Sequence, residues 1–163
     1  MADGNKGYTL IELVIALGIF IIITSGVLIL LNGIAMTDTK EAAKSVDAIL
    51  EKLRLDTMAK GSKSYLHIYY YGNGIYMKVS NEQNSALAEL DSDSGKRIGR
   101  KMSVYYWENG GTEKLLESDE SIAISFNRSS GSFSSNYSSI KFTYSNRSSV
   151  IKCIKETGRH EVN

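Results

Sequence analysis

Residues 7–35 read GYTLIELVIALGIFIIITSGVLILLNGIA. From Leu13 to Ala35 this stretch contains no charged residue over 23 positions. A helix rises ~1.5 Å per residue, so about 20 apolar residues cross a hydrocarbon core of ~30 Å. A core helix in a small domain would carry a polar face, whereas every face of this segment is apolar. The stretch therefore predicts a membrane-spanning helix.

Glu12 lies one turn inside this apolar run. A carboxylate in hydrocarbon costs a few kcal/mol unless it is paired or lies near the interface, so Glu12 is expected to need a counter-charge. A cleavable secretory signal is the alternative explanation of the segment. No small-x-small cleavage site follows the apolar run at the usual distance, which disfavours that alternative.

The polar leader that ends at Gly7, followed by Tyr-Thr-Leu-Ile-Glu at residues 8–12 and the apolar run, resembles the class III signal of type IV prepilins and pseudopilins. The resemblance implies that a prepilin peptidase cleaves between Gly7 and Tyr8 and methylates the new amino terminus on Tyr8. It also implies that Glu12 pairs with the terminal amine of a neighbouring subunit during assembly. Two features depart from the family pattern: Tyr8 replaces the usual Phe, and the chain lacks the proline that many major pilins carry in this helix.

After Ala35 the helical pattern continues but becomes amphipathic. Apolar residues recur at helical spacing while charged residues take the opposite side. The pattern predicts one helix from Thr9 to about Ala59, which Gly61 and Ser62 end. Its apolar side comprises Ala42, Ala43, Val46, Ile49, Leu50 and Leu53.

From Lys63 the apolar period becomes two, which predicts antiparallel strands joined by tight turns. We expect loops at 81–101 and 128–139 and a tail at 157–163. The predicted fold class is α+β and pilin-like, with one long N-terminal helix, membrane half plus amphipathic half, packed on one face of an antiparallel β-sheet. The strands are predicted at 64–71, 75–80, 102–107, 113–117, 121–126, 140–144 and 150–154.

Three segments are expected along the chain. Residues 1–7 form the leader, residues 8–35 the transmembrane and assembly helix, and residues 36–163 the globular domain. The domain is expected to consist of an amphipathic helix at 36–60 and a β-sheet at 63–156, around a single core. Nineteen basic and 18 acidic residues give a net charge of +1, so no strong global field attracts nucleic acid or acidic lipid.

The sequence offers few residues for catalysis. The lone Cys153 excludes an internal disulfide and is expected to be a small buried residue. His67 and His160 stand 93 positions apart, without cysteine or paired carboxylates at ligand spacing, so neither a zinc site nor a Ser-His-Asp triad can be assembled. His67 is expected to face solvent or a tyrosine. We expect no cofactor, no metal and no enzymatic activity, which disfavours the alternative of a membrane-tethered enzyme.

The carboxyl end is mildly basic, through Arg147, Lys152, Lys155 and Arg159. A solvated face is the default interpretation, and contact with DNA phosphates is the alternative. The last forty residues also resemble, more weakly, the type II secretion H-like and FimT-like minor pseudopilins. Lys155 and Arg159 are therefore the candidate DNA contacts, and that resemblance also directs attention to Gly158.

The sequence is thus interpreted as a structural subunit, a minor pilin or pseudopilin. We expect a single-pass membrane protein with an extracytoplasmic globular domain, which then joins a filament at the cell surface or in the periplasm. Its expected partners are prepilin peptidase, the inner or cytoplasmic membrane, and other subunits bound through the N-terminal helix. The alternative is a competence minor pilin that takes up DNA through its basic C-terminal end. Pilus, type II secretion and competence systems all stay open.

Overall fold

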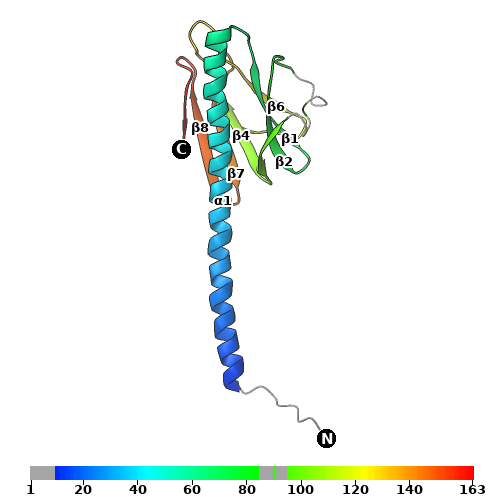
Figure 1. Ribbon diagram of the computed structural model, residues 1–163, viewed down its shortest axis with the longest axis vertical. Coiled ribbons are helices and arrows are strands. Elements are labelled where there is room, and N and C mark those ends of the chain that lie inside the picture. Colours follow the sequence, from blue (N-terminus) through cyan, green and yellow to red (C-terminus); the bar gives the residue numbers. More distant parts are fainter. Residues whose placement is uncertain (1–9, 85–89, 91–94) are drawn as a thin grey trace. The chain divides into compact units, whose positions relative to one another are not determined.

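The structure, a computed structural model, describes residues 10–84, 90 and 95–163, and for residues 22–37 it describes the backbone alone. The chain divides into two compact units, residues 1–34 and 35–163. Helix α1 (Leu10–Lys60) is 51 residues long, and its C-terminal part lies in the second unit together with all the described strands (Figure 1). This arrangement confirms the α+β class, with an N-terminal helix against antiparallel sheets.

Helix α1 ends where the sequence predicts. Gly61 follows its last residue, Lys60, and adopts a left-handed φ of +71°. The Gly61 N–H donates to the Thr57 carbonyl oxygen at 3.2 Å and so satisfies one of the carbonyls that a helix end leaves open. In the last turn, Lys60 pairs with Asp56 at 2.9 Å, and its positive charge suits the C-terminal end of the helix.

The predicted antiparallel sheet is divided into two sheets (Figure 1). The first has the order β3-β2-β1-β6 and the second the order β5-β4-β7-β8-β9. The first sheet comprises β1 (Tyr65–Tyr71), β2 (Gly74–Ser80), β3 (Lys96–Arg100) and β6 (Ser121–Ile124). The second comprises β4 (Ser103–Glu108), β5 (Glu113–Leu115), β7 (Tyr137–Tyr144), β8 (Arg147–Ile154) and β9 (Arg159–Val162).

Strands β3 and β9 were not predicted. Strand β3 lies in the expected loop at 81–101, and β9 lies in the expected tail at 157–163, beyond the expected sheet boundary at residue 156. Both are edge strands that pair with one neighbour only. Their sequences, KRIGR and RHEV, are mostly charged because an edge strand has little surface to bury, and charge protects the edge from unwanted pairing. The period-two apolar pattern is therefore absent from both.

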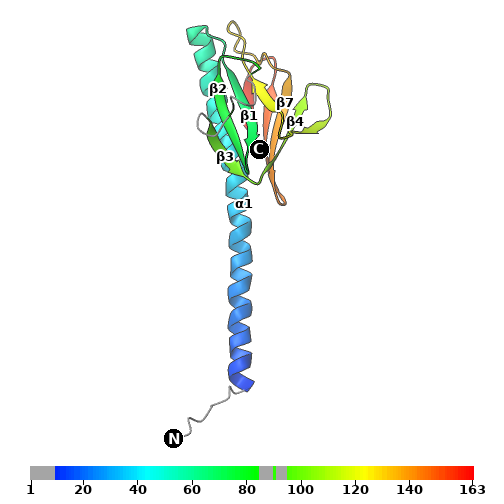
Figure 2. The same ribbon diagram turned by 90° about the vertical axis from the view of Figure 1, so that its right-hand side faces the viewer.

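Helix α1 and both sheets share one hydrophobic core. The predicted apolar side of the helix is buried, with Ile49 partly buried. Figures 1 and 2 show this part of α1 lying along the strands, where two alanines, Ala42 and Ala43, allow close approach. The first sheet contributes Leu66, Ile68, Ile75, Ile122 and Ile124, and the second contributes Val104, Ile140, Phe142, Ile151 and Cys153.

Strand β1 is buried on both faces. Tyr65, His67 and Tyr69 alternate with the core residues and are nevertheless inaccessible to solvent or nearly so. The expectation that His67 faces solvent is wrong, although its ring does lie 6.4 Å from that of Tyr65. His67 Nε2 lies 2.9 Å from the Glu82 carbonyl oxygen, so the backbone after β2 returns over this face. Burial lowers the pKa of His67 and favours its neutral form.

Tyr70 joins the two sheets. Its hydroxyl donates to the Met102 carbonyl oxygen at 3.2 Å and accepts the Val104 N–H at 2.9 Å. Val104 is fully buried, so water cannot replace the tyrosine oxygen as an acceptor for this N–H. Burial also raises the pKa of Tyr70, which keeps the phenol protonated and able to donate.

We predict that Tyr70→Phe lowers the free energy of unfolding by about 1–3 kcal/mol, because it leaves the buried Val104 N–H without an acceptor. Tyr71→Phe is the matched control, since the neighbouring side chain is 46% exposed. Chemical denaturation of the full chain in detergent measures both variants. Equal losses would contradict the proposed role of the Tyr70 hydroxyl.

Candidate functional site

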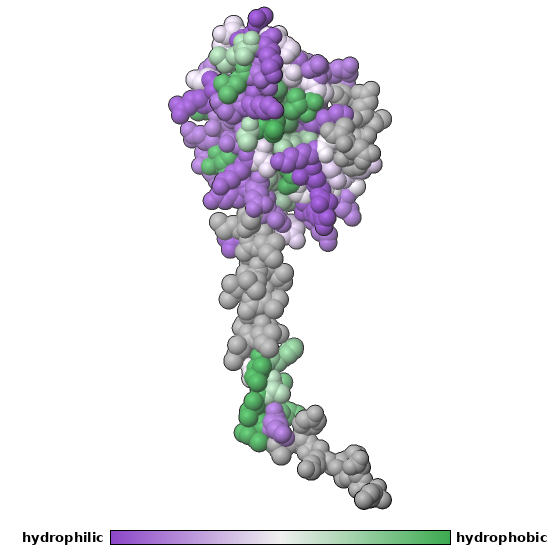
Figure 3. Space-filling model, viewed as in Figure 1, coloured by the Kyte–Doolittle hydropathy of each residue, from purple (hydrophilic) through white to green (hydrophobic). Residues whose placement is uncertain are grey.

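The N-terminal part of α1, residues 10–21, exposes its large apolar side chains. They are between 53% and 83% exposed, and Figure 3 shows hydrophobic side chains gathered on this part of the helix. Contiguous apolar surface of this kind marks a region that other apolar groups cover. The exposed residues are Leu10, Ile11, Leu13, Val14, Ile15, Leu17, Ile19, Phe20 and Ile21.

Glu12 is the only charged residue within residues 10–21 and lies in the first turn of α1. The positive end of the helix dipole favours a carboxylate at this position. The predicted processing residues, Gly7 and Tyr8, lie outside the described residues. Among the side chains that the structure describes, no helix has the length and apolarity needed to cross a membrane.

The two candidate DNA contacts both have partners within the chain. Lys155 is half-buried, and its Nζ donates to the Asn136 side-chain oxygen at 2.8 Å. Arg159 is exposed, and its Nη2 lies 3.8 Å from a carboxylate oxygen of Glu161. The positive charges of Lys155 and Arg159, expected to face outward at the carboxyl end, therefore already interact with side chains of the same chain.

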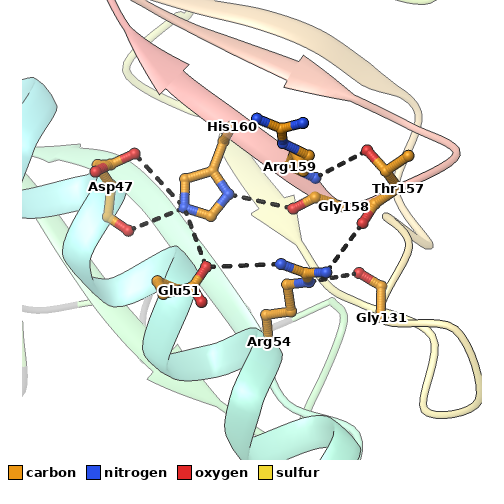
Figure 4. Close-up of polar contacts among 8 residues, drawn as sticks. All are labelled: Asp47, Glu51, Arg54, Gly131, Thr157, Gly158, Arg159 and His160. Carbon is orange, nitrogen blue, oxygen red and sulfur yellow. Dashed lines mark hydrogen bonds and ion pairs between the residues drawn. The ribbon is translucent and has the colours of Figure 1, made fainter.

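Around these residues, Arg54 of α1 joins the helix to two distant loops (Figure 4). Its Nε donates to the Gly131 carbonyl oxygen at 3.1 Å, and its Nη2 donates to the Thr157 carbonyl oxygen at 3.2 Å. Its Nη1 also lies 3.8 Å from the Glu51 carboxylate. Hydrogen bonds from a charged donor are stronger than neutral ones, so this one side chain is a substantial link between helix and loops.

Gly131 and Gly158 allow the two loops to meet backbone to backbone. Both are buried, with left-handed φ values of +64° and +67°. A Cβ at Gly158 would collide with the Gly131 carbonyl oxygen and would lie 3.2 Å from Arg54 Nε. Packing alone thus accounts for glycine at position 158, the position to which the weaker resemblance directed attention.

His160 attaches β9 to the same helix. Its Nε2 lies 3.2 Å from the Asp47 carbonyl oxygen and 3.5 Å from the Asp47 carboxylate, while its Nδ1 lies 3.3 Å from the Gly158 carbonyl oxygen. The side chain is only 5% exposed and packs edge-on against Phe133, with ring centroids 6.2 Å apart. Arg54, His160 and the two glycines together form what we call the C-terminal clamp.

The clamp is not predicted from the sequence. Helical spacing places Arg54 on the charged side of the helix, and Gly131 lies in the serine-rich loop expected at residues 128–139. The sequence feature that could have predicted it is a pair of glycines, Gly131 and Gly158, that no two-residue hairpin turn requires. Such glycines can mark a place where two backbone segments approach closely.

Cys153 is suited to packing rather than to chemistry. It lies on β8 in the core, and burial, with a smaller contribution from the nearby Asp47 carboxylate, raises the pKa of its thiol to about 12. A thiol of this pKa is not a nucleophile at neutral pH. Among the described residues, no group of three His, Cys, Asp or Glu side chains is arranged to hold a metal ion.

Comparison with known families gives a match at the amino terminus. The prokaryotic N-terminal methylation motif matches residues 3–28. Comparison with curated proteins and with solved structures gives no match.

The match and the fold define a chain with an N-terminal methylation motif and an α+β domain of a helix and antiparallel sheets. The chain carries the class III signal peptide that is typical of the type IV prepilin and pseudopilin family, and it is a type IV pilin-like protein. This signal implies processing by prepilin peptidase, anchoring in the inner membrane, and assembly with other pilins into an extracellular filament. Proteins of this family are structural subunits and not enzymes.

The clamp makes a testable prediction about Gly158. Gly158→Ala is expected to cost about 1–3 kcal/mol more than Gly110→Ala, because overpacking against the Gly131 carbonyl adds to the strain of a left-handed alanine. Gly110 is the matched control: its φ is +78° and nothing lies within 4 Å of a Cβ placed there. Thermal unfolding of the two variants tests this, and equal melting temperatures would contradict the close approach.

The burial of Cys153 makes a second prediction. At pH 8 the native chain should react with iodoacetamide at least about a hundredfold more slowly than the unfolded chain, because a pKa of about 12 leaves almost no thiolate. Mass spectrometry of the alkylated chain in buffer and in denaturant measures the difference. Comparable rates in both conditions would show that the thiol is accessible.

Proposed function

We propose that this chain is a minor pilin or pseudopilin that prepilin peptidase cleaves between Gly7 and Tyr8 and methylates on Tyr8. The mature chain then assembles through its N-terminal helix into a pilus or pseudopilus filament. Residues 8–35 act as membrane anchor before assembly and as subunit contact afterwards. Residues 36–163 form the extracytoplasmic domain.

The exposed apolar surface of residues 10–21 is the observation that carries this proposal. Burying apolar surface is worth ~25 cal/mol per Å², so side chains exposed to this extent favour contact with other apolar groups. Lipid supplies those groups before assembly, and the same helix of neighbouring subunits supplies them in the filament. The methylation motif at residues 3–28 overlaps this surface and supports both stages.

Within residues 10–21, the Glu12 charge can define where a neighbouring helix docks along the apolar surface. In the filament its carboxylate would pair with the ammonium group on Tyr8 of a neighbouring subunit. Sliding one helix along another would separate the two charges, and a charge left buried without its partner costs ~3–5 kcal/mol. The pair would therefore set the axial register of the subunits, whereas the apolar contacts provide most of the attraction.

DNA uptake through Lys155 and Arg159 has weaker support. Lys155 already donates to Asn136, and Arg159 lies beside Glu161, so neither cation is arranged for phosphate alone. This alternative stays a prediction. Unchanged retention of the protein on DNA after Lys155→Ala and Arg159→Ala would remove it.

The amino terminus provides the first test. Mass spectrometry of the protein from its native membrane should find a chain that begins at N-methylated Tyr8. A chain that begins at Met1 in cells with active peptidase would contradict the proposal.

Glu12→Ala provides the second test. The variant should still be cleaved and methylated, but its amount in the sheared filament fraction should fall at least about a hundredfold, because ~3 kcal/mol corresponds to more than two factors of ten. Glu156→Ala is the matched control, since Glu156 is an exposed carboxylate of the globular domain outside α1. Normal incorporation of Glu12→Ala would exclude the register role.

A further inference from the structure

A cluster of cations lies on the free edge of the first sheet. Lys96, Arg97, Arg100 and Lys101, on β3 and just after it, are all exposed, and none forms an ion pair with a described residue. We call these four residues the basic edge. Asp38 and Glu41 of α1 line a neighbouring hollow together with Arg97 and Arg100. Four cations in six residues exceed these two carboxylates, and the excess positive charge suggests a partner.

The basic edge borders an open hollow of about 450 Å³. The turn between β1 and β2 forms its floor. A Cβ at Gly74 would lie 2.9 Å from the Tyr76 ring and 3.1 Å from Arg97 Cδ, so the missing side chain keeps the floor open. Tyr71 and Tyr76 pack edge to face with centroids 5.9 Å apart. The lining includes Tyr71, Asn73, Tyr76, Arg97, Arg100 and Lys101.

An acidic counterpart lies near the free edge of the second sheet. Glu117, Asp119 and Glu120 are exposed on a turn that follows β5, which the Glu120 N–H closes by donating to the Glu117 carbonyl oxygen at 3.3 Å. We call residues 117–120 the acidic turn. Burial, followed by the charge of Glu120, raises the pKa of Tyr106, while the Lys114 ammonium 5.9 Å above the ring lowers it. Tyr106 itself packs edge to face on Tyr137 with centroids 5.7 Å apart.

The two surfaces are complementary in charge and alike in construction. Each places its charges near an edge-to-face tyrosine pair, Tyr71 with Tyr76 and Tyr106 with Tyr137, although Lys114 also lies over the Tyr106 ring. The basic edge lies on β3 at one edge of the first sheet, whereas the acidic turn joins β5, at the edge of the second sheet, to β6, at the other edge of the first sheet. Figure 2 shows β3 and β4 on opposite sides of the domain. Within the described part of one chain, no ion pair joins them. A single copy of residues 35–163 thus presents both halves of a contact that it does not make with itself.

We propose that the basic edge of one subunit binds the acidic turn of a second copy of this chain. The inference rests on the proposed function and deepens it by naming a contact between neighbouring globular domains. Because the two surfaces differ, the contact is head to tail, and repeating it extends an assembly instead of closing a two-fold dimer.

The side chains suit this contact. Arginine can donate two parallel hydrogen bonds to one carboxylate, and its planar group stacks on tyrosine rings such as those of Tyr71 and Tyr76. Tyrosine and arginine are also the residue types that most often anchor protein interfaces. Since the charges lie at the surface, salt should weaken the contact.

Cross-linking of two differently tagged full chains tests the contact in the native membrane. One chain carries Asn73→Cys in the open hollow and the other carries Ser118→Cys in the acidic turn, while the buried Cys153 stays unreactive. Mild oxidation should give a disulfide between the two tagged chains. Neither variant alone should give a dimer. Absence of the mixed product, a 73–73 or 118–118 product, or cross-linking only to a different protein would each overturn the proposal.

Charge reversal sharpens the test. Arg97→Glu with Arg100→Glu in the Asn73→Cys chain, or Glu117→Arg with Glu120→Arg in the Ser118→Cys chain, should each reduce the mixed product by about tenfold or more, because like charges then face each other. Making both reversals together should restore it. Arg147→Glu with Lys152→Glu is the matched control, since both side chains are exposed on β8 away from both surfaces, and it should leave the product unchanged. No loss after either reversal, or no recovery in the combination, would overturn the proposal.

The proposed function and the proposed head-to-tail contact can be contradicted separately. An unprocessed amino terminus in the same samples would contradict the proposed function. A chain that begins at methylated Tyr8 and enters filaments, but gives no mixed product, would contradict the head-to-tail contact alone.

Discussion

The guanidinium group of Arg54 is the contact on which the arrangement of residues 35–163 depends. It binds carbonyl oxygens that are 77 and 103 positions away along the chain, at Gly131 and Thr157. The loop at residues 128–139 also places Phe133 in the core, where it packs against Phe126 and His160. The Arg54 hydrogen bonds add a directional link to this packing. With the clamp in place, α1, this loop and the β8–β9 connection are held together.

A net charge of +1 conceals the way in which charge is arranged in this protein. Cations collect at the edge of one sheet and carboxylates near the edge of the other, while the alternating strands between them carry the core. Charge at an edge opposes pairing between identical edges. The same charge is favourable toward an edge of opposite sign. Charged sheet edges of opposite sign can therefore both prevent irregular aggregation and favour an ordered assembly.

The sequence predicts the helices and strands that bury one face and expose the other. Helix α1, its apolar residues from Ala42 to Leu53 and most of the strands follow from periods of 3.6 and two. Strands β3 and β9 escape prediction because edges need no apolar face. Of the two surroundings expected for His67, the tyrosine is found and the solvent is not, because both faces of β1 are covered. The clamp depends on loops that approach only in the folded chain, so no local pattern marks Arg54. The basic run at residues 96–101 is visible in the sequence, but its position at a sheet edge is not.

The contact between His160 and Asp47 spans 113 positions and has a consequence for biosynthesis. At a synthesis rate of ~5–20 residues per second, roughly 6–23 s separate the emergence of the helix from that of the strand that secures it. The strands emerge one after another during this interval, so the apolar side of the helix is not yet fully covered. A nascent chain already anchored by its amino terminus would thus be vulnerable to proteases and to premature association. Chaperones that shield emerging helices would protect it until β9 is synthesised. Only a full-length chain would then be able to complete its domain and assemble.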